Sequence, residues 1–310
     1  MNFGFSEEQE FLRTTAREFL AKESPMTAVR ALMDDPRGYT PDVWAKMAEL
    51  GWLGLLLPEE YGGADLSVVD LIVVAEELGR ALTPSPFFAN LQGSLAVLHG
   101  GTDAQRKEIL PEVASGRRVL SFAITEESGT ENADEIATRA TRSGSGWTLS
   151  GTKLFVPDGQ SADAIVVAAR SGAAGEGGIS LFVVERGAPG LAITPLRSMD
   201  QTRRIAEVRF DGTPAQLLGR EGSGWETWQT VRRHALVYLS AEALGGAQKV
   251  LEDSVKYAKE RIQFGKPIGV NQAIKHKCAD MLTEVESSKS ITYFAAWALA
   301  EKTEEAELAA

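Results

Sequence analysis

The chain has 310 residues, 44% of them hydrophobic, so it is long enough for about two domains and can bury a large core. Its 32 basic and 43 acidic residues give a net charge of −11, which argues against binding to nucleic acids and against a basic membrane-surface helix. One cysteine, Cys278, and three dispersed histidines exclude a disulfide framework and the common metal motifs, and without a long apolar run or a basic leader we expect a cytoplasmic protein.

Residues 1 to about 117 predict helices. Ser6 to Gln9 and Thr102 to Gln105 are capping boxes, in which two side chains satisfy free N–H groups at a helix start. Thr40-Pro41 predicts another helix start, and Ser67 opens an apolar helix that runs through Leu78. Between these two helices, proline and a glycine pair predict a loop over 57–63.

Residues 118 to about 215 predict short strands, because β-branched and aromatic segments alternate with glycine-rich turns. The predicted strands are Val119–Thr125, Thr138–Arg142, Trp147–Val156, Ala164–Ala169, Ile179–Val184, Leu191–Pro195 and Ala206–Phe210. Such regular short strands favour a sandwich or a small barrel. The segment lacks GxGxxG between a strand and a helix, so a dinucleotide-binding α/β unit is not expected.

The last part, from about 222, predicts two long helices. Glu226–Glu260 is one helical pattern without proline, Gly265 to Pro267 interrupt it, and a second helix runs from about Asn271 to at least Ala300. Two helices fall short of a four-helix bundle, so we expect either further chain or another subunit to complete this lobe. The predicted fold class is α+β, with domains at 1–117, 118–218 and 219–310.

Four motifs occur in matching places along this order of helices, strands and helices. They are LPEEYGG at 57–63, AITE at 123–126, GTKLFV at 151–156, and YAKERIQFGKPIG at 257–269, the last continued by Gln272-Ala273, Lys275-His276 and 279–281. On these motifs the chain resembles the acyl-CoA dehydrogenase family along essentially its whole length.

The resemblance implies an N-terminal helical domain, a central β-barrel or sandwich, and a C-terminal helical bundle that is incomplete here. It also implies FAD as cofactor and an acyl-CoA as substrate. In this family a glutamate removes the α proton and the β hydrogen leaves as hydride to the flavin. The flavin lies at a subunit boundary, where a neighbouring chain contacts its pyrophosphate and adenine.

Five residues resemble cofactor-binding positions of the family. Arg261 is expected to meet the pyrophosphate of a neighbour's FAD, since a guanidinium fork suits two phosphate oxygens; the alternative is an exposed helix-end arginine. Phe264 is expected near the adenine, or else in a core, and the amides of Gln263 and Gln272 to donate to the cofactor. For Gln272 the alternative is an ordinary polar residue. Thr125 is expected at the flavin pyrimidine, or else as a strand threonine.

Two positions depart from the family pattern. Glu131 falls where a pyrophosphate-binding serine is expected, and a carboxylate there would repel phosphate. In Phe155-Val156-Pro157, the proline replaces a threonine whose hydroxyl reaches the reactive flavin nitrogen, and proline offers neither O–H nor N–H. We therefore expect a weak flavin site on this chain itself.

The residue that acts as base is also not found among the 310 residues, so no catalytic residue is predicted. One family position lies beyond Ala310, and the other corresponds to Ala235, with Leu236 in place of the adjacent arginine. Glu242, about two turns further along the helix, is a possible relocated base or an ordinary helix-face carboxylate. His234 titrates near neutrality when unperturbed, but a surface or satisfied histidine is the expected reading.

These observations predict a subunit of a heteromeric acyl-CoA dehydrogenase that lacks the base and completes the FAD site of a second, partner dehydrogenase subunit. One alternative is an active homomeric enzyme whose sequence continues further, although internal changes such as Pro157 argue against it. The other is a non-enzymatic scaffold or acyl-CoA-binding protein, against which the motif around Arg261 argues.

Overall fold

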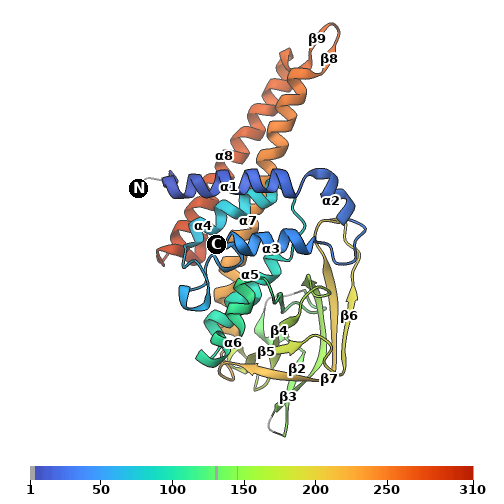
Figure 1. The fold of residues 1–310 in the computed structure, drawn as a ribbon, viewed down its shortest axis with the longest axis vertical. Coiled ribbons are helices and arrows are strands. Elements are labelled where there is room, and N and C mark those ends of the chain that lie inside the picture. Colours follow the sequence, from blue (N-terminus) through green and yellow to red (C-terminus); the bar gives the residue numbers. More distant parts are fainter. Residues whose placement is uncertain (1–3, 130–131, 145, 310) are drawn as a thin grey trace. The chain divides into compact units, whose positions relative to one another are not determined.

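The computed structural model describes residues 4–129, 132–144 and 146–309. The chain forms two compact units, each built from separate stretches of sequence. Unit 1 comprises Met1–Ala28, Ser67–Thr83 and Leu236–Ala310, and unit 2 comprises Val29–Leu66 and Pro84–Ala235. The expected order of helices, strands and helices is confirmed (Figure 1). The domain borders near residues 118 and 219 stay a prediction.

The helices begin and end close to the predicted signals. The α-helices are α1 (Glu7–Glu23), α2 (Met26–Leu32), α3 (Pro41–Glu49), α4 (Val68–Ala81), α5 (Phe87–Gly100), α6 (Asp103–Ala114), α7 (Gly224–Glu260), α8 (Gln272–Ala300) and α9 (Ala306–Ala309). Short 3₁₀ turns are η1 (Trp52–Gly54), η2 (Glu59–Tyr61), η3 (Ala133–Glu135), η4 (Glu176–Gly178) and η5 (Ile268–Val270). Within the described ranges, no helix combines the length and the apolar character that crossing a membrane requires.

Unit 1 packs α1 and α4 against the helices of the C-terminal region. The capping box at Ser6 forms as predicted, with the Gln9 N–H donating to Ser6 Oγ at 3.2 Å and the Ser6 N–H donating to Gln9 Oε1 at 3.0 Å. Arg17 donates two hydrogen bonds to Glu77, at 3.0 and 2.7 Å, which tie α1 to α4. A bidentate arginine–carboxylate pair fixes orientation as well as distance, so it sets the register of the two helices.

Two glycines let α4 and α7 cross at backbone contact. A Cβ atom on Gly79 would lie 1.9 Å from the carbonyl oxygen of Glu242, and one on Gly245 would lie 1.9 Å from that of Glu76. Both distances are far below any real contact, so only glycine fits at either position. The crossing therefore positions this part of α7, including Glu242, relative to α4.

Beyond the crossing, residues 246–284 form a two-helix extension that we call the arm. It contains the second part of α7, a hairpin of β8 (Ile262–Gln263) and β9 (Lys266–Pro267), and the first part of α8 (Figure 1). The core between its helices is small, with Leu244, Leu251 and Val285 buried at its base. Most side chains nearer the hairpin are exposed.

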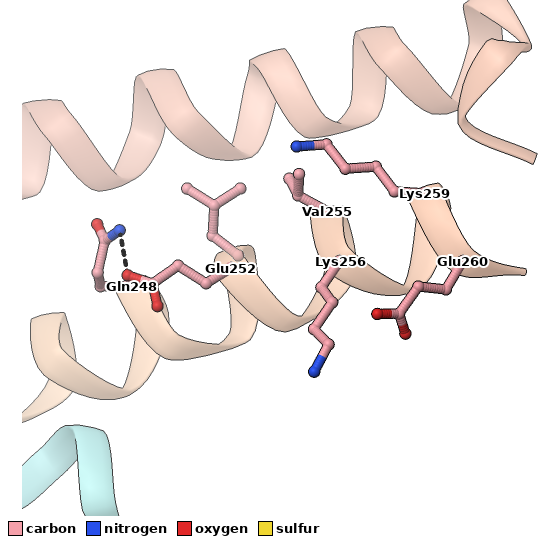
Figure 2. A pocket seen from close by; sticks show the side chains of 7 residues that line it. Gln248, Glu252, Val255, Lys256, Lys259 and Glu260 are labelled. Carbon is pink, nitrogen blue, oxygen red and sulfur yellow. Dashed lines mark hydrogen bonds between the residues drawn. The ribbon is translucent and has the colours of Figure 1, made fainter. Parts of the chain in front are cut away.

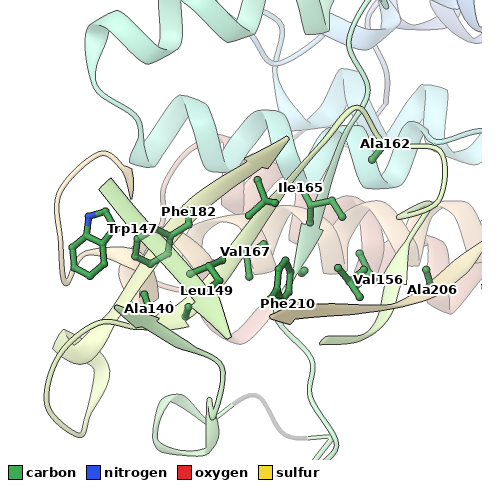
Figure 3. Packing of buried hydrophobic residues seen from close by; sticks show 14 residues of the cluster. Ala140, Trp147, Leu149, Val156, Ala162, Ile165, Val167, Phe182, Ala206 and Phe210 are labelled. Atoms are coloured by element: carbon green, nitrogen blue, oxygen red, sulfur yellow. The ribbon is translucent and has the colours of Figure 1, made fainter. Parts of the chain in front are cut away.

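Unit 2 contains a seven-stranded mixed sheet. Its strands are β1 (Leu120–Ala123), β2 (Arg139–Ser143), β3 (Gly146–Pro157), β4 (Ala164–Arg170), β5 (Ile179–Glu185), β6 (Leu191–Pro195) and β7 (Ile205–Leu218). The sheet closes on itself because β5 pairs with both β4 and β7, which gives the barrel alternative of the predicted class. Phe182, Phe210 and Trp147 fill its interior (Figure 3).

Helices α2, α5 and α9 and part of strand β7 were not predicted. Helix α5 is buried along most of its length and packs on β1, where a Cβ on Gly93 would lie 2.4 Å from the Leu120 Cβ and Asn90 Oδ1 accepts the Leu120 N–H. An evenly apolar helix has no amphipathic period to detect. Strand β7 extends eight residues past the predicted end at Phe210, since Pro214 and its neighbours pair with β3 and then β5.

Candidate cofactor site

The end of the arm gathers four of the five predicted cofactor residues. Arg261 follows the last residue of α7, and its carbonyl accepts the Ile268 N–H at 2.9 Å, which closes the hairpin. Gln263 pairs with Lys266 across the hairpin, and Gln272 is the first residue of α8. Arg261, Gln263 and Gln272 are all exposed.

The hairpin turn presents Phe264 to solvent. Phe264 and Gly265 have φ angles of +52° and +78°, the pair of positive values that a two-residue turn needs to match the strand twist. Glycine adopts such angles freely, but phenylalanine does so only with strain. The Phe264 side chain is 99% exposed, so the core-phenylalanine alternative is wrong. A strained and fully exposed aromatic ring at a turn is typical of a recognition element.

Thr125 lies in unit 2, two residues after the end of β1. Its carbonyl accepts the Leu154 N–H at 2.9 Å, so it lies beside the start of the Phe155 to Pro157 run. Phe155 is 56% exposed with φ at +53°, within a register shift of β3 against β7. The Pro157 carbonyl accepts the Ser121 hydroxyl at 2.5 Å. This surface offers a threonine hydroxyl and an aromatic face, and Pro157 adds no donor.

A buried ion pair lies next to Thr125, and the sequence analysis did not assign a role to this pair. Lys153 is fully buried, and its Nζ donates to Glu126 Oε1 at 2.6 Å and to the Ile124 carbonyl at 2.9 Å. Glu126 also accepts the N–H groups of Ala137 and Thr138, at 2.8 and 3.0 Å. The pair therefore joins β1, β3 and the segment before β2 around Thr125.

Burial sets the electrostatics of this pair. Loss of solvation lowers the pKa of the Lys153 ammonium to about 8, although Glu126 opposes that shift. Burial alone would raise the pKa of Glu126, but the charge and hydrogen bonds of Lys153 and the Thr138 N–H hold it below its ordinary value. The sequence contained a signal: Trp147 and Leu149 place the odd positions of β3 inside, and Lys153 occupies the same phase.

The helix positions considered for a base lie on α7. Ala235 is buried in α7 and carries no titratable group. Glu242 is half-buried on α7, and its carbonyl forms the contact with Gly79. His234 Nδ1 lies 2.9 Å from the Thr230 carbonyl oxygen, and burial lowers the pKa of its ring, as fits a satisfied histidine. Glu131 lies outside the described residues.

Metal chemistry has no candidate site in the part of the chain that the structure describes. No three histidine, cysteine or acidic side chains gather closely enough there to hold an ion. Among the described residues, the candidate site instead provides a guanidinium without an ion-pair partner, exposed aromatic rings, amides and a hydroxyl. These groups suit a nucleotide-like ligand.

Comparison with known proteins gives matches along nearly the whole chain. Three acyl-CoA dehydrogenase family models match, for the N-terminal domain at residues 6–117, the middle domain at 121–213 and the C-terminal domain at 222–310. An acyl-CoA dehydrogenase of Bacillus subtilis (strain 168) is 32% identical over 305 residues, covering 94% of this chain and 79% of that protein.

Two further matches come from other organisms. A cyclohex-1-ene-1-carbonyl-CoA dehydrogenase of Geobacter metallireducens is 35% identical, covering 94% of this chain and 78% of that protein. A solved structure concerned with the electron transferring flavoprotein of Acidaminococcus fermentans contains a chain that superposes with a TM-score of 0.92 at 32% identity, covering 100% of this chain and 83% of that one.

Proposed function

We propose that this chain, which belongs to the acyl-CoA dehydrogenase family, is one subunit of a cytoplasmic FAD-dependent complex that oxidises an acyl-CoA to its 2,3-enoyl form. In this proposal the end of the arm completes the FAD site of a partner dehydrogenase subunit. The observation that carries it is the unpaired, exposed Arg261 beside the fully exposed ring of Phe264.

The residues at the arm end fit the outer part of FAD. The Arg261 guanidinium has the fork geometry for two pyrophosphate oxygens, and no described residue forms an ion pair with it. The Phe264 ring is free to stack on adenine, and Gln263 and Gln272 have amide donors for the remaining oxygens. FAD, when bound, supplies the acceptor for the hydride that leaves the acyl chain.

The ring-holding half on this chain fits FAD less well. Thr125 has a hydroxyl, and its carbonyl accepts the N–H of Leu154, the residue before the exposed Phe155, but Pro157 has no donor for the reactive edge of a flavin. Ala235 has no group that accepts a proton. We therefore assign proton removal and the flavin ring to the partner subunit, and cofactor binding to this chain.

Flavin content tests this proposal. The chain is purified alone and together with any acyl-CoA dehydrogenase encoded beside it, and FAD is measured from its absorbance. We expect little FAD with the isolated chain and FAD in the complex. Arg261→Ala in the complex should lower FAD affinity about ten- to a hundredfold, the effect of losing a charge-assisted contact. Lys107→Ala, an exposed lysine on α6, is the matched control. Unchanged FAD affinity in Arg261→Ala would contradict the proposal.

A second candidate is an active homomeric enzyme with its own flavin. The observation that favours it is the Lys153–Glu126 pair, which holds Thr125 in place for a cofactor on this same chain. About one FAD per chain in the isolated, assembled protein would support this candidate and exclude the heteromeric one.

A further inference from the structure

The arm end carries a positive charge that contrasts with the rest of the chain. Residues 256–277 contain six basic side chains and one acidic one, a formal charge of +5 in a chain of −11, which leaves −16 for the remainder. We call the six the basic cluster: Lys256, Lys259, Arg261, Lys266, Lys275 and Lys277. Its sign is opposite to that of the molecule as a whole.

The basic cluster is not neutralised within the chain. All six side chains are exposed, and none of them forms an ion pair with another described residue. The nearest acidic residues along α7 are already engaged, since Glu252 accepts hydrogen bonds from Arg80, and Asp253 pairs with Lys249. Within residues 256–277 Glu260 is the single acidic residue, and on α8 Asp280 and Glu284 follow, so the segment 256–284 still has a formal charge of +3. The potential of the cluster is therefore directed outward.

Apolar groups lie among these charges. Lys256 and Lys259 leave α7 on opposite sides and border a groove of about 370 Å³, to which Leu251 and Val255 contribute apolar surface (Figure 2). Nearer the hairpin, Tyr257 and Ile262 are 58% and 54% exposed, in addition to Phe264. Exposed aromatic rings beside cations are the composition of a protein interface rather than of a solvated helix.

The charge balance of the arm end indicates which kind of partner surface would bind it. This step rests on the proposed function, in which Arg261 meets an FAD pyrophosphate. A pyrophosphate carries about two negative charges, so about three positive charges of the arm end remain. Cations that lose water at an interface without opposite charges are costly to bury. We propose that the partner dehydrogenase subunit presents acidic side chains to the arm end outside its flavin phosphate site, and that these bind Lys256, Lys259 and their neighbours and steer assembly.

Assembly kinetics test the proposal without relying on activity. The chain and the neighbouring-gene dehydrogenase are purified separately and mixed at 50 to 500 mM NaCl, and association is followed by light scattering. We expect the association rate to fall at least tenfold over this range, as for electrostatically steered partners. A double variant, Lys256→Glu with Lys259→Glu, should slow association at low salt by tenfold or more. Replacing both lysines with Gln should have a smaller effect of the same sign.

Two controls separate this interface from general effects. Lys107→Glu makes one charge reversal of the same kind on α6, and it should leave association unchanged, whereas Lys256→Glu alone should already slow it. Thermal unfolding of each variant should match the parent, because the replaced side chains are exposed. FAD per assembled complex should also stay constant, since Lys256 and Lys259 are not assigned to the cofactor.

The possible failures are distinguishable. If association is independent of salt and of both lysines while the complex still binds FAD through Arg261, the acidic surface is overturned and the proposed function stands. If no complex forms, or if the isolated chain already binds its own FAD, the proposed function fails and this inference fails with it.

Discussion

Gly245 and Gly246 are adjacent in α7, and replacing each of them with alanine should change the stability of the fold in opposite directions. In Gly245→Ala the new Cβ would lie 1.9 Å from the Glu76 carbonyl oxygen, whereas in Gly246→Ala the nearest atom, the Gly79 carbonyl oxygen, is 3.7 Å away. The first contact is with helix backbone, which cannot rotate aside, so α4 and α7 must separate. Overpacking of this kind costs about 1–3 kcal/mol. The second substitution has room.

Helix propensity sharpens the contrast. Alanine is favoured over glycine by about 1 kcal/mol inside a helix. Gly246→Ala should therefore raise the free energy of unfolding by up to about 1 kcal/mol, while Gly245→Ala should lower it by up to about 2 kcal/mol after the same gain is included. Chemical unfolding followed by circular dichroism measures both values. Adding Gly79→Ala to Gly245→Ala should cost less than the sum of the two, because separating the helices once relieves both contacts.

Equal stability of Gly245→Ala and Gly246→Ala would refute the reasoning, since it would mean that the two helices do not touch through their backbones. A loss in both variants would instead show that glycine flexibility, rather than close approach, is required in this part of α7.

Three further predictions concern single side chains. The pKa of Lys153 is lowered to about 8 in the folded chain from an ordinary 10.5, so between these pH values the unfolded state binds more protons than the folded state. The free energy of unfolding should therefore rise with pH across this window, by at most about 3 kcal/mol. Denaturant titrations of the parent and of Lys153→Met at each pH measure this rise. Phe264→Ser should weaken FAD binding by the complex yet leave the melting temperature of the isolated chain unchanged, because the ring is 99% exposed, and a lower melting temperature of that chain would contradict the assignment of Phe264 to recognition. Glu242→Gln should leave turnover by the complex nearly unchanged, since the residue lies at the crossing with Gly79, and a fall of several orders of magnitude with FAD still bound would identify it as the base.

Local signals in the sequence predicted much of the fold. The capping boxes at Ser6 and Thr102 form with the expected reciprocal hydrogen bonds, and Pro41 is the first residue of α3. Gly265 to Pro267 separate the two long helices as predicted, although this segment belongs to a hairpin rather than a simple break. These features depend on neighbours within a few residues, which a sequence displays directly.

Features that depend on distant partners were not predicted. Nothing near Gly79 or Gly245 indicates that each lies against a carbonyl of the other helix. The partner of Lys153 is Glu126, outside β3, so the sequence near Lys153 does not show the ion pair. The one local signal is that Lys153 occupies a position of β3 whose alternation predicts an apolar, buried residue. Phe264 was open between a cofactor position and a core, because a phenylalanine in a motif is compatible with either, and only its exposure in the fold excludes the core.

The continuity of α7 has a consequence for how activity depends on protein concentration. Glu242 and Arg261 lie on or directly after the same helix, 19 residues apart, so about 28 Å of helix separates them. A short ribityl chain links the flavin ring to its pyrophosphate, so these two parts of FAD lie much closer together than Glu242 and Arg261 do. In one chain, a group near Glu242 and the side chain of Arg261 therefore cannot contact the same cofactor. Under the proposed function, each FAD is held by two chains. Dilution below the dissociation constant of the assembly should therefore release cofactor and lower specific activity together, and saturating FAD should in turn strengthen the assembly.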